Sequence, residues 1–426
     1  MSPVSRSATE PVHNLRQEIA ELAALPQVQA ALDWFAEQEA EFTRWQLELA
    51  GIPAPPFGEA KRAEWLRAKF NEIGLEQVHT DEVGNVLGVL SGSAMPAISI
   101  SAHVDTVFPA GIVVNPRQQG RKLYGPGISD NAAGVTALLA LALGCRRFRP
   151  PHAASLLFVA NVGEEGEGDL RGIRHIFSEC EWKDRIGASV VIDGAGIDTI
   201  IADALGSRRF EITVQGPGGH SWTDFGAPNP IVAISRAITL FSEIRVPASP
   251  KTTFNVGVIS GGTSVNSIPE SASMRVDIRS SSAFEIERLE LELRSAVKQA
   301  VQREDNGTDR GESAERELET VIKVIGNRPA GELDRKSRIL QLARAVDSYL
   351  GNSAQLQRAS TDANIPISLG REAIAIGAGG RGGGAHTLQE WFDPAGRELG
   401  LQRALLLVLA LAAGGSNGVT GCGVTG

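Results

Sequence analysis

The chain has 426 residues, 42% of them hydrophobic and 21% charged, and it carries a net charge of −9. Because one hydrophobic core rarely organises a chain of this length, the composition predicts a globular protein of two domains. The negative charge disfavours nucleic acid and anionic lipid as partners, since both are built on phosphate groups of the same sign.

Cysteine usage and hydropathy bear on the cellular compartment. The three cysteines, Cys145, Cys180 and Cys422, are too few and too scattered for a disulfide framework or a CxxC metal knuckle. No apolar stretch follows the first basic residues, and the chain has no apolar run long enough to span a membrane. We therefore expect a cytoplasmic protein without export or membrane insertion.

The first hundred residues show helical and then alternating patterns. Apolar residues at helical spacing predict two amphipathic helices over residues 13–50 and another helix over 60–73, which ends at Gly74. Residues 76–92 alternate around the turn signal Val83-Gly84-Asn85, a pattern typical of paired strands.

Three apolar runs rich in β-branched residues predict buried strands at 97–106, 155–162 and 188–194. A strongly apolar helix begins after the segment SDNAAG, between the first two runs. Strands that alternate with helices predict an α/β fold with a mainly parallel, doubly wound sheet and helices on both faces.

The pattern changes near Ser207. Strand and helix signals now follow in the order β-α-β-β-α, at 209–216, 228–241, 253–260, 273–279 and 283–302. They predict an inserted α+β domain of the split βαβ, ferredoxin-like kind over 207–322, between catalytic segments 1–206 and 323–426. Its exposed sheet edge could pair with a second copy, so we expect a homodimer. Residues 303–315 favour a loop, and the tail after Ala413 favours disorder.

Candidate metal ligands follow the predicted strands. His103 and Asp105 lie two apart on an extended segment, so both side chains point to the same face of the sheet. Asp130 stands at the start of a helix, where it could bind metal or serve as an N-cap. Imidazole nitrogen and carboxylate oxygen are the usual ligands of divalent metals in hydrolases.

Later segments add more residues of the same types. Glu164 and Glu165 come directly after a buried strand, and adjacent carboxylates at a strand end favour a nearby cation, although a solvated acidic loop is the alternative. Asp193 follows the next strand, where it could instead form an Asp-Gly turn. His386 lies in the glycine-rich segment GGRGGGAH, where a surface histidine is the alternative.

Taken in order, several short motifs resemble the M20 family of metallopeptidases over roughly residues 100–393. They are HVDT, GPGISDNAAG, GEEGE, VIDG, GPGGHS, GGTSVNSIPESASMRVDIR, STDAN and GAHTLQEWF. In that family two zinc ions share a bridging carboxylate and a bridging water. By this resemblance the metal ligands are His103, Asp130, Glu165, Asp193 and His386.

The resemblance also implies a role for each member of the site. Asp130 would bridge the two ions, with His103 and Asp193 on one of them and Glu165 and His386 on the other. Asp105 would orient the imidazole of His103, and Glu164 would act as the general base that activates water. Cobalt or manganese could replace zinc with the same ligand types.

Three residues of the inserted domain complete the implied site. His220 in GPGGHS resembles the family histidine that crosses from a partner subunit to the oxyanion, whereas a turn residue is the alternative. Asn266 and Arg279 resemble residues that hold substrate, and an arginine suits bidentate capture of a carboxylate. A strand cap and a surface charge are their respective alternatives.

The substrate is less sharply indicated. Family members that act on short peptides from the amino end, or split dipeptides, tend to carry Asp where Asp193 stands, and the segment around Asp362 resembles the tripeptidase-like branch. We therefore expect hydrolysis of a peptide bond in short peptides. Removal of an N-acyl group from an amino acid, or carboxypeptidase action, is the alternative at the same site.

The sequence argues against two other classes of function. A metal-binding or scaffolding protein on the same fold would need no general base, so the presence of Glu164 argues against it. A nucleotide-binding enzyme would need the motif GxxxxGK[ST] or a glycine-rich turn between a strand and a helix, and the sequence offers neither.

Overall fold

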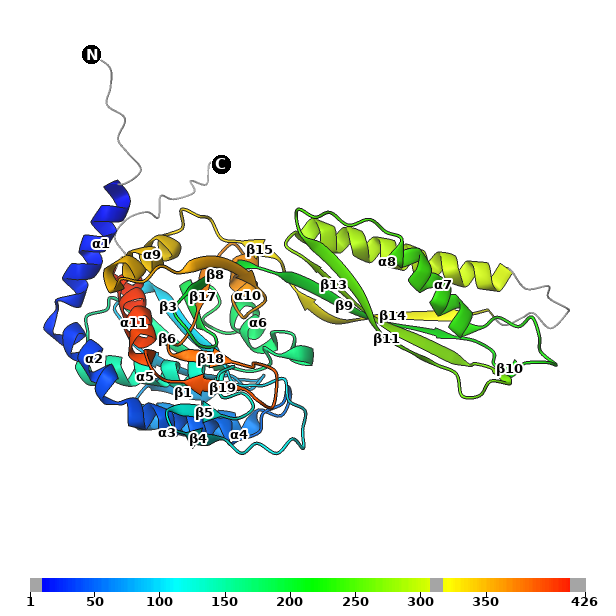
Figure 1. Cartoon of the computed structure of the whole chain (residues 1–426). Coiled ribbons are helices and arrows are strands. Elements are labelled where there is room, and N and C mark those ends of the chain that lie inside the picture. Colours follow the sequence, from blue (N-terminus) through cyan, green and yellow to red (C-terminus); the bar gives the residue numbers. More distant parts are fainter. Residues whose placement is uncertain (1–9, 307–316, 414–426) are drawn as a thin grey trace, which may run out of the picture. The chain divides into compact units, whose positions relative to one another are not determined.

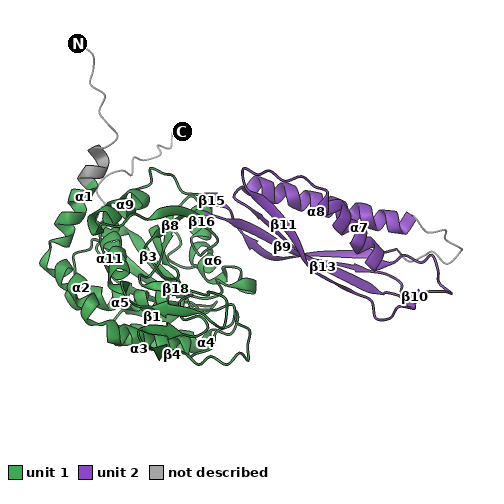
Figure 2. Ribbon diagram, in the orientation of Figure 1, with its two compact units in different colours: residues 1–203, 332–426 green, residues 204–331 purple. Residues whose placement is uncertain are grey.

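The computed structural model describes residues 10–306 and 317–413. The chain divides into two compact units (Figure 2). Unit 1 holds the residues up to Asp203 and from Glu332 onward, and unit 2 holds Ala204–Gly331. The boundaries expected from the sequence, 206/207 and 322/323, fall inside strands β9 (Gly206–Gln215) and β14 (Glu319–Arg328) of the second unit.

Unit 1 is built on a large sheet with the strand order β1-β2-β6-β3-β7-β17-β8-β15, and β16 pairs with β8 (Figure 1). The inner strands β6, β3, β7 and β17 are parallel, and the pairs β1–β2, β2–β6 and β17–β8 are antiparallel. The strands are β1 (Glu76–Thr80), β2 (Val86–Leu90), β3 (Ala94–His103), β6 (Ala154–Asn161), β7 (Ile186–Ile192), β8 (Thr199–Ala204), β15 (Gly331–Glu332), β16 (Gln355–Ala359) and β17 (Glu372–Ile376). The predicted α/β class with a mainly parallel sheet is confirmed.

Helices cover both faces of this sheet. The helices of unit 1 are α1 (Glu10–Ala23), α2 (Pro26–Glu37), α3 (Glu39–Ala50), α4 (Ala60–Ile73), α5 (Ala132–Phe148), α6 (Arg171–Ser178), α9 (Arg338–Leu350), α10 (Asn364–Ser368) and α11 (Arg397–Ala413). Along β6, Leu156 and Phe158 join the core under α5 and α11, whereas Leu157 and Val159 face the core under α6. This period of two shows why the strand is apolar throughout.

The N-terminal region differs from the prediction of two helices over 13–50. Three helices are present, because the backbone of Gln38 leaves the helical region (φ −98°, ψ 12°) and separates α2 from α3. Pro26 occupies the first turn of α2, a position that needs no backbone N–H. The predicted helix over 60–73 is confirmed as α4, and Gly74 ends it in the left-handed conformation (φ 83°).

A small second sheet in unit 1 has the strand order β18-β19-β5-β4. Its strands are β4 (Arg117–Gln119), β5 (Lys122–Tyr124), β18 (Arg381–Gly383) and β19 (Trp391–Asp393). All its pairs are antiparallel, and β19 joins β5 through Trp391 opposite Tyr124. This sheet therefore brings the segment that carries His386 beside the segment that precedes Asp130.

Unit 2 is an antiparallel sheet, β11-β13-β9-β14, covered on one face by two helices. Its other elements are β10 (Gly219–His220), α7 (Pro230–Ser242), β11 (Thr252–Gly261), β12 (Ser267–Ile268), β13 (Ser271–Ser280) and α8 (Ala283–Asn306). The chain order β-α-β-β-α-β and this strand order are those of a split βαβ fold. Helix α8 continues through 303–306, where a loop was expected, and residues 307–315 and the tail after Ala413 lie outside the described residues.

Within the described ranges, no helix is both long enough and apolar enough to cross a membrane.

Candidate metal centre

The site forms where the parallel strands of unit 1 end. His103 is the last residue of β3, Asp193 follows β7 directly, and Glu164 and Glu165 lie in the loop after β6. Because β6, β3 and β7 are adjacent and parallel, their carboxyl ends meet at one edge of the sheet. Ligand sites of open α/β sheets lie at this edge.

Two groups of side chains converge there, and both include Asp130. In the first group, the Nε2 atom of His103 lies 3.2 Å from Oδ1 of Asp130 and 3.7 Å from Oδ1 of Asp193. In the second, the Nε2 atom of His386 lies 3.2 Å from Oδ2 of Asp130 and 3.2 Å from Oε1 of Glu165. Within each group the candidate ligand atoms lie within 4.8 Å of one another. The two oxygens of Asp130 therefore face different histidines, which is the arrangement of a bridging carboxylate.

The sequence left open whether Asp130 caps helix α5. In the structure Asn131, the next residue, is the N-cap. The side chain of Asn131 accepts the backbone N–H of Gly134 at 3.1 Å and caps α5. Asn131 also donates to the carbonyl oxygen of Ile192 at 2.9 Å. The Asp130 carboxylate therefore does not cap the helix, and its two oxygens contact His103 and His386.

Asp105 is fully buried and holds its neighbours through both its backbone and its side chain. Its carbonyl oxygen lies 3.2 Å from Nδ1 of His103, whereas its carboxylate lies 3.6 Å away. Since a carbonyl only accepts, Nδ1 of His103 carries the proton and Nε2 is free to bind metal. The Asp105 carboxylate accepts the backbone N–H groups of Glu164 at 3.0 Å and Glu165 at 2.8 Å.

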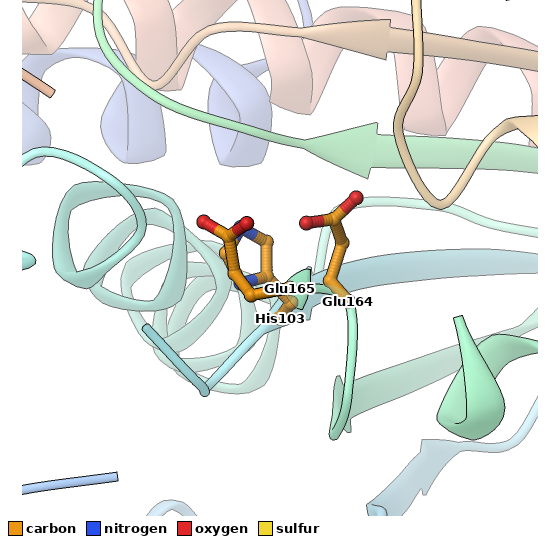
Figure 3. A group of neighbouring side chains, drawn as sticks. All are labelled: His103, Glu164 and Glu165. Carbon is orange, nitrogen blue, oxygen red and sulfur yellow. The ribbon is translucent and has the colours of Figure 1, made fainter. Parts of the chain in front are cut away.

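Glu164 and Glu165 are 5% and 6% exposed, and both have an oxygen within 4.8 Å of a His103 nitrogen. Figure 3 shows their carboxyl groups beside the His103 ring. A solvated acidic loop was the alternative for this pair, and their burial contradicts it. Two buried carboxylates this close together repel one another unless a cation or a proton lies between them.

Protonation in this cluster follows from burial and mutual charge. Burial raises the pKa of Glu165 to about 7, and the negative charges of Asp130 and Asp105 add to the rise. The pKa of His386 rises to about 9, chiefly through its hydrogen bond to Asp130. Burial opposes a charged His103, but three carboxylates outweigh it and raise its pKa well above the usual value. Protons shared among carboxylates and imidazoles are what a metal ion replaces, so the donor set fits divalent cations.

Sequence reasoning missed three buried residues around this cluster. The Glu390 carboxylate accepts the backbone N–H groups of Gly127, Ser129 and Asp130. The guanidinium of Arg62 donates to the carbonyl oxygen of Val104, between His103 and Asp105, at 2.7 Å. No short motif signals either contact, because both partners are backbone groups distant in sequence.

The third missed residue is Asp362, within the segment STDAN. It is fully buried and accepts a hydrogen bond from Nδ2 of Asn161 at 2.6 Å. Burial raises the pKa of Asp362 to about 7, the charge of His103 and the Asn161 hydrogen bond oppose the rise, and Asp193 and Asp105 add to it. Asn161 lies opposite His103 in the register of β6 and β3, so Asp362 is joined to the candidate metal ligands through Asn161.

The three candidate residues of unit 2 fall into two places. His220 and Asn266 are exposed neighbours, since β10 pairs with β12 and Ser221 donates to the Asn266 carbonyl oxygen at 3.0 Å. Nδ1 of His220 accepts the N–H of Trp222 at 3.2 Å, which places the ring proton on Nε2. Arg279 lies near the opposite end of β13, roughly 27 Å from Ser271 at the rise of an antiparallel strand, and pairs with Asp277.

Two known peptidase domains resemble parts of the chain. The peptidase dimerisation domain of the M20 type matches residues 204–305, which lie in unit 2. Peptidase family M28 matches residues 85–214, a range that contains His103, Asp130, Glu165 and Asp193. The first match covers the inserted domain, which holds the motifs GPGGHS and GGTSVNSIPESASMRVDIR, and so favours the M20 type over the M28 type.

Relatives and solved structures agree with this assignment. A probable carboxypeptidase of Ajellomyces capsulatus is 31% identical over 220 residues, which cover 47% of the chain and 49% of the relative. The chain thus spans about half the length of that curated relative. A tripeptidase from Staphylococcus aureus shares the fold with a TM-score of 0.69 at 20% identity, covering 87% of the chain and 97% of the other.

A dinuclear metal-binding peptidase of the M20 family from Bacillus subtilis also has this fold, with a TM-score of 0.62 at 16% identity, covering 88% of the chain and 98% of the other. The shared fold, the match to the dimerisation domain and the ordered motifs all point the same way. The inserted domain thus resembles the dimerisation domain of M20 peptidases, and the whole chain shares the fold of solved peptidases of that family.

Proposed function

We propose that the protein hydrolyses a peptide bond in short peptides with a pair of divalent cations, as an aminopeptidase or dipeptidase. The observation that carries the proposal is the pair of ligand groups that share Asp130, with the buried carboxylate of Glu164 beside them. In this proposal His103, Asp130 and Asp193 hold one ion, and Asp130, Glu165 and His386 hold the other.

The chemistry of the donors is compatible with zinc, the metal that we propose. Each group offers one imidazole nitrogen and two carboxylate oxygens, a ligand set that zinc, cobalt and manganese all accept. When bound, such a pair of ions supplies Lewis acidity and favours the ionisation of water at neutral pH. Zinc is the proposal, and the ligand types leave cobalt and manganese as substitutes.

Glu164 is the proposed general base. Its backbone N–H is held by the buried Asp105 carboxylate, which fixes the start of the side chain. Its carboxylate takes a proton from the attacking water as the C–O bond forms and the carbonyl oxygen becomes an oxyanion. It then gives that proton to the amine nitrogen, the carbonyl forms again, and the peptide C–N bond breaks. The fixed base acts without a nucleophilic serine or cysteine.

Unit 2 is the proposed dimerisation and lid domain. With its proton on Nε2 and its ring exposed, His220 can donate a hydrogen bond to a developing oxyanion. Asn266 lies beside it and can hold the substrate backbone. The exposed guanidinium of Arg279 can hold a carboxylate, but near the opposite end of β13 and therefore apart from these two residues. We propose a homodimer in which His220 serves the site of the partner subunit.

The bond cleaved is the finer part of the proposal. Asp193 at the first metal position favours peptides with a free amino group, and the tripeptidase fold neighbour is consistent with such substrates. Carboxypeptidase action or removal of an N-acyl group is the second candidate, favoured by the identity with a probable carboxypeptidase. Small peptides and N-acyl amino acids are therefore the two substrate classes to compare.

A matched pair of substrates separates these candidates. A tripeptide with a free amino group and its N-acetylated analogue would be digested by the metal-loaded protein, and the metal content of the same sample would be measured. We expect faster cleavage of the free peptide, at its first bond. Preferential cleavage of the acetylated analogue, or release of the C-terminal residue, would favour the second candidate.

A cytoplasmic location remains part of the proposal. Its support is the scattered cysteine pattern, in which Cys145 and Cys180 are both buried free thiols. Free thiols are typical of reducing compartments. Fractionation of the source cells would test this.

A further inference from the structure

Glu390 is a buried carboxylate, 1% exposed, that is satisfied by backbone amides. It accepts the N–H groups of Gly127 at 2.8 Å, Ser129 at 2.7 Å and Asp130 at 2.7 Å. Among the described residues, no lysine or arginine nitrogen forms an ion pair with it. Three charge-assisted hydrogen bonds to one loop make a strong and directional anchor.

The same residue is tied to the segment that carries His386. Glu390 lies four positions after His386 and directly before β19, which pairs with β5. Its carbonyl oxygen accepts the N–H of Gly125 at 3.1 Å. Glu390 thus contacts the loop of residues 125–130 through both its backbone and its side chain.

Glycines allow this close approach. Gly127 adopts a left-handed conformation (φ 72°), and a Cβ atom there would lie 2.5 Å from the Thr106 side chain. A Cβ atom on Gly382 of β18 would lie 2.2 Å from Oγ of Ser129. Gly382 thus lets β18 lie close to the loop of residues 125–130, and Gly127 lets that loop turn beside Thr106.

We propose that Glu390 is a positioning residue that fixes the spacing between Asp130 and His386, and so prepares the ligand group of the second cation before that cation binds. Asp130 and His386 lie on separate loops, and Glu390 joins those loops. His103 and Asp193 stand at the ends of β3 and β7, so their group shares only Asp130 with this anchor, whereas the second group depends on it through both Asp130 and His386. The inference rests on the proposed metal centre.

The variant Glu390→Gln tests the proposal with little change in shape. A glutamine keeps one acceptor oxygen, but its amide nitrogen would face a backbone N–H where the second oxygen had accepted one. Glu372→Gln is the matched control, because Glu372 also accepts two backbone N–H groups, from Arg338 and Ile339, but stands at the opposite end of a strand from the site.

The readout is cobalt binding to each purified protein, measured by chelator competition and by the visible absorption of each bound ion. We expect Glu390→Gln to weaken one of the two ions by about 10- to 100-fold and to alter its absorption, as loss of a supporting hydrogen-bond partner does. The control should bind both ions like the wild type. Equal affinities in Glu390→Gln and wild type would overturn the proposal.

Hydrogen exchange on the wild type keeps the proposal falsifiable if the variant fails to fold. The amides of Gly127, Ser129 and Asp130 should be protected in the metal-free protein, because Glu390 already holds them. Exchange at an unprotected rate until cobalt is added would show that the metal orders the loop, and would overturn the proposal. A wild type that binds fewer than two ions would instead refute the proposed function.

Discussion

His103 and His220 occupy opposite environments, one in each unit. His103 is 1% exposed and lies among the carboxylates of Asp105, Asp130 and Asp193. His220 is exposed on a short strand, and its ring contacts are backbone N–H groups of its own turn. The first histidine belongs to a cluster of ionisable groups, whereas the ring of the second forms no ion pair with a carboxylate of the described residues.

This difference separates two kinds of contribution to catalysis. A buried cluster of like charges strains the metal-free fold and gains from cations, so unit 1 should respond to metal in both stability and activity. His220 is an exposed hydrogen-bond donor on a turn and does not experience this charge repulsion. Changes at His220 should therefore affect turnover and leave metal binding and stability unaltered.

Glu164 should give the largest effect. Replacing it with glutamine removes the base but keeps the size of the side chain, so turnover of a short peptide should fall by roughly 10²–10⁴-fold. Metal content should remain that of the wild type. Glu167→Gln, in the exposed part of the same loop, is the control and should retain activity. Retained metal with unchanged turnover in Glu164→Gln would remove Glu164 from the mechanism and favour a binding protein.

His220→Ala should lower turnover by roughly 10²–10³-fold, the usual loss when one oxyanion donor is removed. The number of bound metal ions and the melting temperature should not change. His79→Ala removes another exposed histidine and should be silent. Equal turnover in His220→Ala and His79→Ala would count against a catalytic role for His220 of unit 2.

The stability of the metal-free protein should fall as pH rises from about 5 to about 9. The pKa of Glu165 rises from 4.5 to about 7 on folding, so its stabilising proton is lost through that window. The pKa of His386 rises from 6.5 to about 9, so its contribution is complete below pH 6.5 and is lost as pH passes 9.

Saturating metal should reverse this trend, since cations compete with the same protons and bind better as pH rises. Urea unfolding of both forms across the range provides the measurement. Metal-free stability that increases between pH 5 and 9 would mean that these groups do not carry the stated protons in the folded protein.

Arg279→Lys should give the smallest change. Lysine keeps the charge but loses the planar fork that binds a carboxylate through two nitrogens, so KM should rise about 3- to 10-fold with kcat preserved. A fall in kcat with constant KM would instead indicate a role in the transition state. Steady-state kinetics with one tripeptide suffices.

Much of the fold could be predicted from local patterns. The apolar runs that became β3, β6 and β7 are buried on both faces, and Gly74 ended its helix as expected. The break at Gln38 escaped prediction because neither glycine nor proline marks it. There the packing of α2 and α3, with Trp34 against Phe42 at 5.7 Å, decides the geometry.

The motifs predicted which residues are candidate ligands, but they did not predict the contacts that hold those residues in place. Whether Asp130 caps α5 could not be read from SDNAAG, since Asp130 and Asn131 are both good caps and only the backbone shows that Asn131 takes that role. Glu390 and Arg62 act on backbone groups distant in sequence, and such contacts leave no spacing to recognise.

Anomalous X-ray diffraction from crystals grown with zinc tests the metal centre most directly. We predict two peaks in unit 1, one among His103, Asp130 and Asp193 and the other among Asp130, Glu165 and His386. A single peak, or peaks away from Asp130, would contradict a centre in which one carboxylate joins two ions.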